Sequence, residues 1–163
     1  MKEKKKADAK IGRWFEKTKV KPALDELQAT HNLYYHGFTD THAAGAFVNN
    51  APGDFLVVLE GVPILIECKA SNVHETLRSC LADAVENHQV GTHKLFIRAM
   101  GASLFMFYSD ATALVEFWPG VAVIAARANG TPIDPAHRFC WVHVDDLATS
   151  FLGWARENRP YYP

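Results

Sequence analysis

Two carboxylates and one ammonium group stand out in the chain, at Asp54 and within Glu67-Cys68-Lys69. Carboxylate oxygens are the ligands that hard cations such as Mg²⁺ and Mn²⁺ prefer. An ammonium group beside such a cation can orient water, help to deprotonate it, or stabilise negative charge on a phosphate under attack. These residue types therefore predict metal-assisted hydrolysis of a phosphodiester.

The chain between these groups brings them together if it forms a β-hairpin. Glu60-Gly61 suits a two-residue loop, because glycine adopts positive φ readily. Counting outward from this loop places Asp54 opposite Glu67, and opposed residues hold their Cβ atoms roughly 4.5–5.5 Å apart. Lys69 shares the face of Glu67, because side chains alternate along a strand. The hairpin thus predicts one charged face.

The same register gathers apolar side chains on the other face, which we expect to be buried. Two adjacent carboxylates repel each other, and a divalent cation removes the conflict. A structural alternative stays open, in which Asp54 caps a turn after Pro52-Gly53 and Glu67 and Lys69 form an exposed pair. The apolar face comprises Phe55, Val57, Leu59, Val62, Ile64, Ile66 and Cys68.

The spacing of Pro52-Gly53-Asp54 and Glu67-Cys68-Lys69 resembles the signature of PD-(D/E)XK nucleases, with Gly53 inserted between proline and aspartate. His88-Gln89 follows on an expected helix, and Gly101 precedes a strand-like run over 102–108. This order is similar to that of RecU-type Holliday junction resolvases and their phage relatives, over about residues 11–118.

The resemblance implies an α/β, three-layer restriction-endonuclease-like fold with a central mixed β-sheet flanked by helices. A single nuclease domain would span 11–163, after a basic N-terminal arm over 1–10 that either grips DNA or is a solvating tail. The implied activity is that of a Mg²⁺-dependent endonuclease, with Mn²⁺ able to substitute, that makes paired nicks in a four-way DNA junction. Two symmetric nicks require two active sites related by a two-fold axis, so we expect a homodimer.

The resemblance also assigns roles within the site. Asp54 and Glu67 would bind the metal, and Glu16 of the first helix would complete the acidic set. Lys69 and Gln89 would assist the attack of water. A structural alternative for Glu16 and Gln89 is an ordinary polar residue on a helix face. Two further functions stay open: a restriction- or repair-type nuclease acting on other DNA, and a non-catalytic junction-binding protein.

Charge along the chain is uneven, although the net charge is −1. Residues 1–21 carry nine Lys or Arg and three acidic residues, and the remainder carries eight basic and fifteen acidic residues. Contacts to DNA phosphates should therefore come mainly from the first segment. Residues 33–50 lead into the first catalytic strand as an excursion or hairpin and add further candidates. The predicted DNA contacts are Arg13, Lys17, Lys19, Lys21, Tyr35, His36, His42, Arg78 and His88.

The remaining pattern predicts one helix over about 9–29, bent near Pro22, and another over 75–98 with a weak point at Gly91. Strands are expected over 102–109, 112–118 and 139–142. A last helix over 144–157 would have an apolar face that includes Trp141.

Cysteine content and hydropathy bear on the compartment. Three cysteines without zinc-ligand spacing favour reduced thiols. No apolar run reaches the length of about 18 residues that a membrane span needs. We therefore expect no membrane association and a cytoplasmic location, in a bacterium or in the host of a phage.

Overall fold

The structure, a computed structural model, describes residues 2–38, 52–99 and 101–158, with side chains from residue 9 onward. Its described strands form one six-stranded sheet whose spatial order follows the sequence. Neighbouring strands run antiparallel except for β3 and β4, which are parallel. The strands are β1 (Leu33–Gly37), β2 (Phe55–Leu59), β3 (Val62–Ser71), β4 (Ala102–Ser109), β5 (Leu114–Pro119) and β6 (Cys140–His143).

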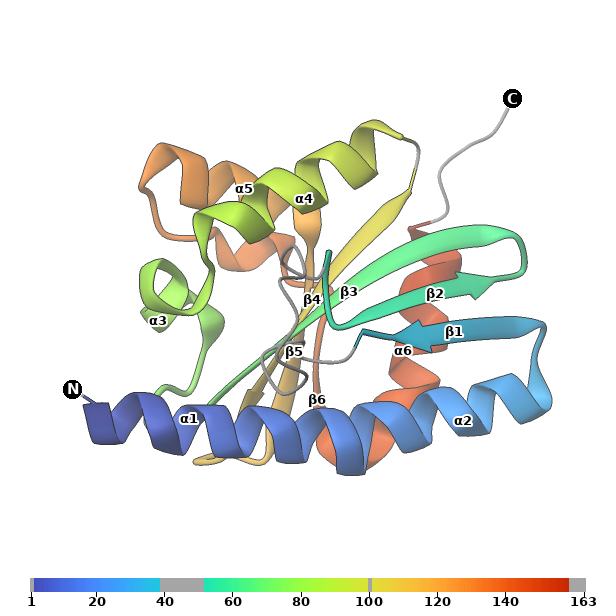
Figure 1. The fold of residues 1–163 in the computed structure, drawn as a ribbon, viewed down its shortest axis with the longest axis horizontal. Helices are drawn as coiled ribbons and strands as arrows, with labels where there is room; N and C mark the ends of the chain where they lie inside the picture. Colours follow the sequence, from blue (N-terminus) through green and yellow to red (C-terminus); the bar gives the residue numbers. More distant parts are fainter. Residues whose placement is uncertain (1, 39–51, 100, 159–163) are drawn as a thin grey trace, which may run out of the picture.

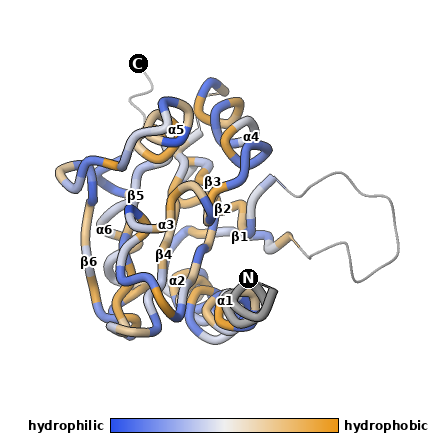
Figure 2. The backbone as a smooth tube through the Cα atoms, turned by 90° about the vertical axis from the view of Figure 1, so that its left-hand side faces the viewer, coloured by the Kyte–Doolittle hydropathy of each residue, from blue (hydrophilic) through white to orange (hydrophobic). Residues whose placement is uncertain are grey.

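Helices cover both faces of this sheet, so the expected three-layer α/β architecture with a mixed central sheet is confirmed (Figure 1). Figure 2 shows α4 and α5 on one side of the strands and α1 and α2 on the other. The helices of one face are α1 (Lys2–Phe15), the π-helical η1 (Glu16–Val20), α2 (Lys21–Thr30) and α6 (Leu147–Glu157). Those of the other face are α3 (Leu77–Ala84), α4 (Asn87–Arg98) and α5 (Gly120–Asn129).

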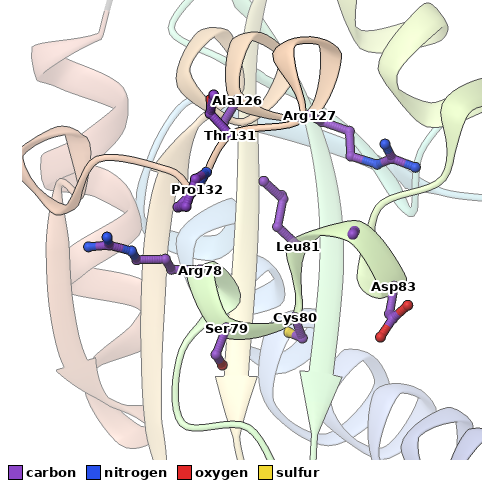
Figure 3. Close-up of a pocket in the computed structure, with 11 residues that line it drawn as sticks. Arg78, Ser79, Cys80, Leu81, Asp83, Ala126, Arg127, Thr131 and Pro132 are labelled. Atoms are coloured by element: carbon purple, nitrogen blue, oxygen red, sulfur yellow. The ribbon is translucent and has the colours of Figure 1, made fainter.

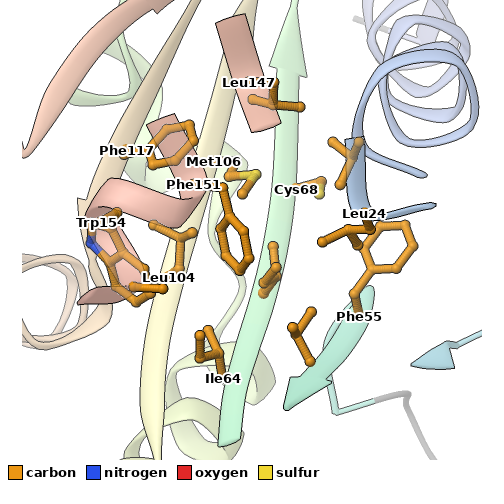
Figure 4. Packing of buried hydrophobic residues seen from close by; sticks show 14 of the residues in the cluster. Leu24, Phe55, Ile64, Cys68, Leu104, Met106, Phe117, Leu147, Phe151 and Trp154 are labelled. Carbon is orange, nitrogen blue, oxygen red and sulfur yellow. The ribbon is translucent and has the colours of Figure 1, made fainter. Parts of the chain in front are cut away.

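Two hydrophobic clusters bury the faces of the sheet. The larger one packs the strands against α2 and α6 through residues such as Leu24, Phe151 and Trp154 (Figure 4). The smaller one packs Phe105 and Phe107 of β4 against α3 and α5. Both faces of β4 are therefore buried, which is typical of a central strand that has a parallel neighbour. None of the described helices has the length and apolarity to cross a bilayer.

The β2–β3 hairpin has the predicted register. Leu59 pairs with Val62, and the ladder continues to Phe55 and Ile66. Glu60 and Gly61 both have positive φ, at 50° and 86°, which is the conformation of a type I′ turn. All seven residues of the predicted apolar face belong to the larger cluster, so the prediction that the hairpin separates charge from apolar surface is confirmed.

The predicted helix over 75–98 is wrong in one respect, because the chain forms two helices with a break at Val85 and Glu86. Both residues are extended, and the side chain of Val85 is fully buried in the smaller cluster. Glu86 begins α4 with a capping box, in which its side chain and that of Gln89 each bond the other's backbone N–H. Gly91, the expected weak point, lies within α4.

The predicted bend near Pro22 is also misplaced. Helical structure runs from Lys2 to Thr30, and the irregular part is the π-helical turn at Glu16–Val20. Pro22 lies in the first turn of α2, where the missing N–H is tolerated. Phe15 and Val20, five residues apart, are both fully buried, and this spacing suits the i→i+5 repeat of a π-turn. α1 crosses the boundary expected after residue 10.

The C-terminal third departs from the sequence pattern at four points. α5 was not predicted, because its Val and Ile residues also suit a strand; it ends at Gly130, which has a φ of 64°. β5 starts at Leu114, after a turn over 110–113. Val144–Asp146 is a 3₁₀ turn before α6. Trp141 lies in β6, where Arg138 stacks on its ring at 4.6 Å, and not on the face of the last helix.

A substitution at Gly120 tests the packing of α5 on the sheet. A Cβ at this position would overlap the Oγ of Ser103 on β4. We expect Gly120→Ala to lower the free energy of unfolding by about 1–3 kcal/mol, the range for overpacking in a core. Urea unfolding measures this change in the free energy of unfolding. Gly153→Ala in α6 is the control: nothing lies within 4 Å of its Cβ position, and alanine there should stabilise by about 0.5–1 kcal/mol. Equal effects of the two substitutions would contradict the prediction.

Candidate active site

Asp54 lies one residue before β2 and is anchored on β3. Its Oδ2 accepts a hydrogen bond from the backbone N–H of Cys68 at 2.6 Å, and its own N–H donates to the carbonyl of Ile66 at 2.9 Å. The ladder itself ends at Phe55 and Ile66, so the predicted direct pairing of Asp54 with Glu67 is replaced by these bonds. The carboxylate is thereby fixed to the backbone next to Glu67.

Close packing against β3 explains why position 53 is a glycine, although this residue interrupts the nuclease-like motif described above. A Cβ at this position would lie 2.9 Å from the carbonyl oxygen of Ile66 and 3.0 Å from the side chain of Leu65. Only glycine allows the chain to approach β3 so closely. The inserted residue therefore helps to bring Asp54 against β3.

Glu67 is the best-connected side chain of the site and only 3% exposed. Its Oε1 accepts from the Lys69 ammonium at 2.8 Å and also from the Gln89 amide. Its Oε2 faces Nε2 of His93 at 3.6 Å. The carbonyl oxygen of the Gln89 side chain accepts from the backbone N–H of Glu86 at 2.9 Å, so the residue that caps α4 also holds Glu67.

The two carboxylates of the hairpin have opposite pKa shifts. For Asp54, burial and the charges of Glu67 and Glu16 raise the pKa well above its usual value, against the opposing effects of the Cys68 N–H and Lys69. For Glu67, burial also acts to raise the pKa, but Lys69 and His93 outweigh it and the pKa is lowered. The negative charge of Asp54 is thus poorly compensated by the protein alone.

Glu16, the third predicted metal ligand, interacts electrostatically with Glu67 and Lys69. Burial raises its pKa, and the charge of Glu67 adds to this effect, while Lys69, Lys17 and Arg13 act to lower it. The first helix therefore brings Glu16 within electrostatic range of the hairpin. Glu16 is also the first residue of the π-helical turn, and such turns frequently mark functional sites.

Lys69 is held as an ammonium group. Burial acts to lower its pKa, but the charge and hydrogen bond of Glu67, with the charge of Asp54, outweigh burial and raise it. An amine whose pKa is raised stays protonated at neutral pH and has no free electron pair with which to accept a proton. Lys69 is therefore better suited to stabilising negative charge than to removing a proton.

The donor set fits a hard cation in its chemistry. Among the described residues, no three His, Cys, Asp or Glu side chains form a ready metal cage. Mg²⁺ does not need one, because it is usually held by one or two carboxylates, several waters and the phosphates of a substrate. Asp54 and Glu67 supply such carboxylates, and a cation would compensate the charge of Asp54. Metal binding here stays a prediction.

The predicted DNA contacts on the first helices fall into two groups. Arg13 and Lys17 are exposed, and both act on the pKa of Glu16, so they lie beside the acidic group. Lys19 pairs with Asp145 at 2.8 Å, and Lys21 pairs with Asp25 at 2.8 Å.

The other predicted contacts lie further along the chain. Tyr35 donates to Asp25, and His36 is exposed on β1. Nδ1 of His88 lies 3.2 Å from Oε2 of Glu86. Arg78 lines a surface hollow between α3 and α5 together with Arg127 (Figure 3). His42 lies outside the described residues.

The sequence interpretation missed His93, which is fully buried next to Glu67. A signal was present, because His93 follows Gln89 by four residues and so shares its face of the helix. The contact to β4 that gives His93 its position is not local in sequence, and no pattern in α4 indicates it.

Comparisons with known proteins find similarity among solved structures. Neither a protein-family model nor a curated protein matches the chain. Among solved structures, the chain is similar to Hjc of Archaeoglobus fulgidus, a Holliday junction resolvase from an archaeal hyperthermophile. The TM-score is 0.49 and the sequence identity 15%, over 81% of this chain and 98% of that chain.

Removing the charge of Asp54 tests the electrostatics of the site. Because Asp54 is half-buried near two other carboxylates that raise its pKa, Asp54→Asn should raise the melting temperature in chelator at neutral pH. A raised folded-state pKa means that the carboxylate destabilises the fold as pH rises through that pKa, so the gain should grow with pH and shrink in acid. Thermal melts between pH 4 and 8 measure it. Asp25→Asn, at an exposed ion pair, is the control and should bring no gain; a lower melting temperature for Asp54→Asn would contradict the electrostatic interpretation.

Proposed function

We propose that this protein is a Mg²⁺-dependent DNA endonuclease that hydrolyses phosphodiesters at Asp54 and Glu67. The observation that carries the proposal is the convergence of two carboxylates, one ammonium and one amide, which come from the residue before β2, from β3 and from α4. A purely structural ion pair between Glu67 and Lys69 gives no reason for Asp54 to be fixed beside it against charge repulsion. A site that takes up a divalent cation gives such a reason, because the cation would offset the repulsion between the two carboxylates.

Each side chain has a role that follows from its contacts. A bound Mg²⁺ would supply Lewis acidity at the scissile phosphate and a site for the attacking water. Asp54 and Glu67 would hold the ion, and Glu16 would add negative charge to the same side. Lys69 would leave Glu67 for the phosphate and stabilise the charge that develops there. Gln89 would keep Glu67 oriented from α4.

We further propose a four-way junction as the substrate and a homodimer as the active form. The order of motifs resembles that of RecU-type resolvases and supports this choice. A junction offers two strands related by a two-fold axis, and two copies of one site answer that symmetry. Arg13 and Lys17, exposed beside Glu16, are suited to the phosphates next to the cleaved bond.

A nuclease of the restriction or repair type is the second candidate. It is favoured by the contacts of Lys19, Lys21 and Tyr35, which already pair with Asp145 or Asp25 within the chain. These pairs reduce the positive surface that a large branched substrate would require. A single duplex or a single strand needs less positive surface for binding than a branched junction does.

Cleavage assays test the catalytic assignment. A labelled four-way junction and a linear duplex of the same sequence are each incubated with Mg²⁺ or with chelator. We expect paired nicks in the junction that require Mg²⁺. Asp54→Asn and Glu67→Gln should each lower the cleavage rate at least about 100-fold, the usual scale for lost transition-state stabilisation, while junction binding persists. Cleavage of both DNAs at similar rates would favour the second candidate, and cleavage that survives both substitutions would refute the site.

Salt dependence of binding tests the two exposed basic residues. Each phosphate contact contributes a slope of about −0.9 to the dependence of log K on log salt. Arg13→Ala and Lys17→Ala should each reduce the slope for junction binding by about 1. Lys21→Ala is the matched control, because Asp25 already neutralises Lys21, and it should leave the slope nearly unchanged. A larger change for Lys21 would place the DNA elsewhere on the protein.

A further inference from the structure

His93 is a buried imidazole for which the proposed mechanism has no use so far. The residue has no exposed surface, and its ring lies 4.6 Å from that of Phe105. Nδ1 is 2.7 Å from the hydroxyl of Ser103, whereas Nε2 has no hydrogen-bond partner within the described residues and points to Glu67 Oε2 at 3.6 Å. Burying a polar nitrogen without a full hydrogen bond is unfavourable, so a purely structural role in the core would be better filled by an apolar side chain.

The neighbours of the ring determine which nitrogen carries the proton. A carboxylate only accepts hydrogen bonds, so the nitrogen that faces Glu67 must be a donor. In the neutral ring, Nδ1 is then an acceptor and the Ser103 hydroxyl donates to it. Ser103 therefore directs the Nε2–H of His93 at Glu67.

The space for this hydroxyl depends on α5. Gly120, the first residue of α5, is buried, and any Cβ there would overlap Ser103 Oγ. The contacts run from Gly120 to Ser103 of β4, then to His93 of α4 and finally to Glu67 of β3. A chain of contacts through α5, β4 and α4 thus leads to one oxygen of Glu67.

The oxygens of Glu67 are divided between two sets of partners. Within the described residues, Oε1 accepts from Lys69 and Gln89, whereas Oε2 faces Nε2 of His93. A donor beside Oε2 fixes the plane of the carboxylate, so that Oε1 faces the side of the site where Lys69 lies and where a cation would bind. Outer partners of this kind typically change metal affinity or activity by 10–100-fold when removed.

We propose that His93 is a positioning residue that, directed by Ser103, holds Glu67 Oε2 so that Oε1 faces the metal. This inference rests on the proposed function. It predicts that His93 acts on metal affinity and not on DNA affinity.

Mn²⁺ binding without DNA, measured by isothermal titration calorimetry, tests the proposal. His93→Phe keeps an aromatic ring but removes the donor, and it should weaken Mn²⁺ binding about 10–100-fold. His93→Gln, whose amide nitrogen lies near the position of Nε2, should stay within a few-fold of the parent protein. Equal affinity of His93→Phe and the parent protein would overturn the proposal, and so would equal losses in the two variants.

Ser103→Ala is a milder variant that keeps the test valid if His93→Phe does not fold. Loss of the Ser103 hydroxyl should weaken Mn²⁺ binding several-fold. Ser109→Ala on the same strand is the matched control, because its buried hydroxyl has no hydrogen-bond partner in the described part of the chain, and it should change nothing. Equal behaviour of the two serine variants would count against the role of His93.

Cleavage as a function of Mg²⁺ separates the inference from the function on which it rests. His93→Phe should need about 10–100-fold more Mg²⁺ for half-maximal cleavage and approach the parent rate at saturation, with an unchanged junction Kd. A lower rate at every Mg²⁺ concentration would overturn the positioning role. If the parent protein binds no Mn²⁺ and resembles Asp54→Asn in binding and cleavage, the proposed function itself fails.

Discussion

Electrostatic repulsion between the carboxylates of Asp54 and Glu67 is the constraint that the surrounding structure has to overcome. Asp54 is fixed by a backbone N–H of β3, and Glu67 is almost fully buried two positions from Lys69. A single ammonium cannot compensate both charges, and the opposite pKa shifts of the two acids express this shortage. In most folds such a pair would be replaced by neutral side chains, because an uncompensated buried charge destabilises by several kcal/mol. Its presence here requires a rigid surrounding structure, and it is the reason for proposing a ligand of positive charge at this site.

That rigidity comes from backbone contacts on both sides of β3. The type I′ turn at Glu60-Gly61 fixes the register of the hairpin, and Gly53 lets the chain before β2 approach β3 at van der Waals distance. On the other side, the parallel pairing with β4 places Ser103 where it reaches His93. α4 begins with a capping box whose Gln89 also contacts Glu67, so the start of the helix and the orientation of the carboxylate are set by one side chain.

The sequence predicted the parts that depend on local rules. A two-residue turn and the alternation of side chains determine the register of the hairpin, and both can be read from Glu60-Gly61 and its flanking residues. The break at Val85 and Glu86 was missed because Val85 is held extended by burial among residues distant in sequence, which outweighs the helical spacing around it. α5 was missed because GVAVIAARAN suits a strand as well as a helix until Gly130 is known to be its cap. His93 could be placed on the face of Gln89, but its function depends on Ser103 of another element.

Departures from local rules gather at one place in this molecule. The π-turn begins at Glu16, the inserted glycine precedes Asp54, and the imidazole with an unpaired nitrogen adjoins Glu67. Each of these features is unfavourable alone, and a sequence selected only for stability would lose them. The two hydrophobic clusters, which contain most of the large buried side chains, supply the stability that offsets them. Since the unfavourable features converge on the same carboxylates, one explanation covers them all: they are the requirements of the proposed site, which would bind a cation and act on a phosphate.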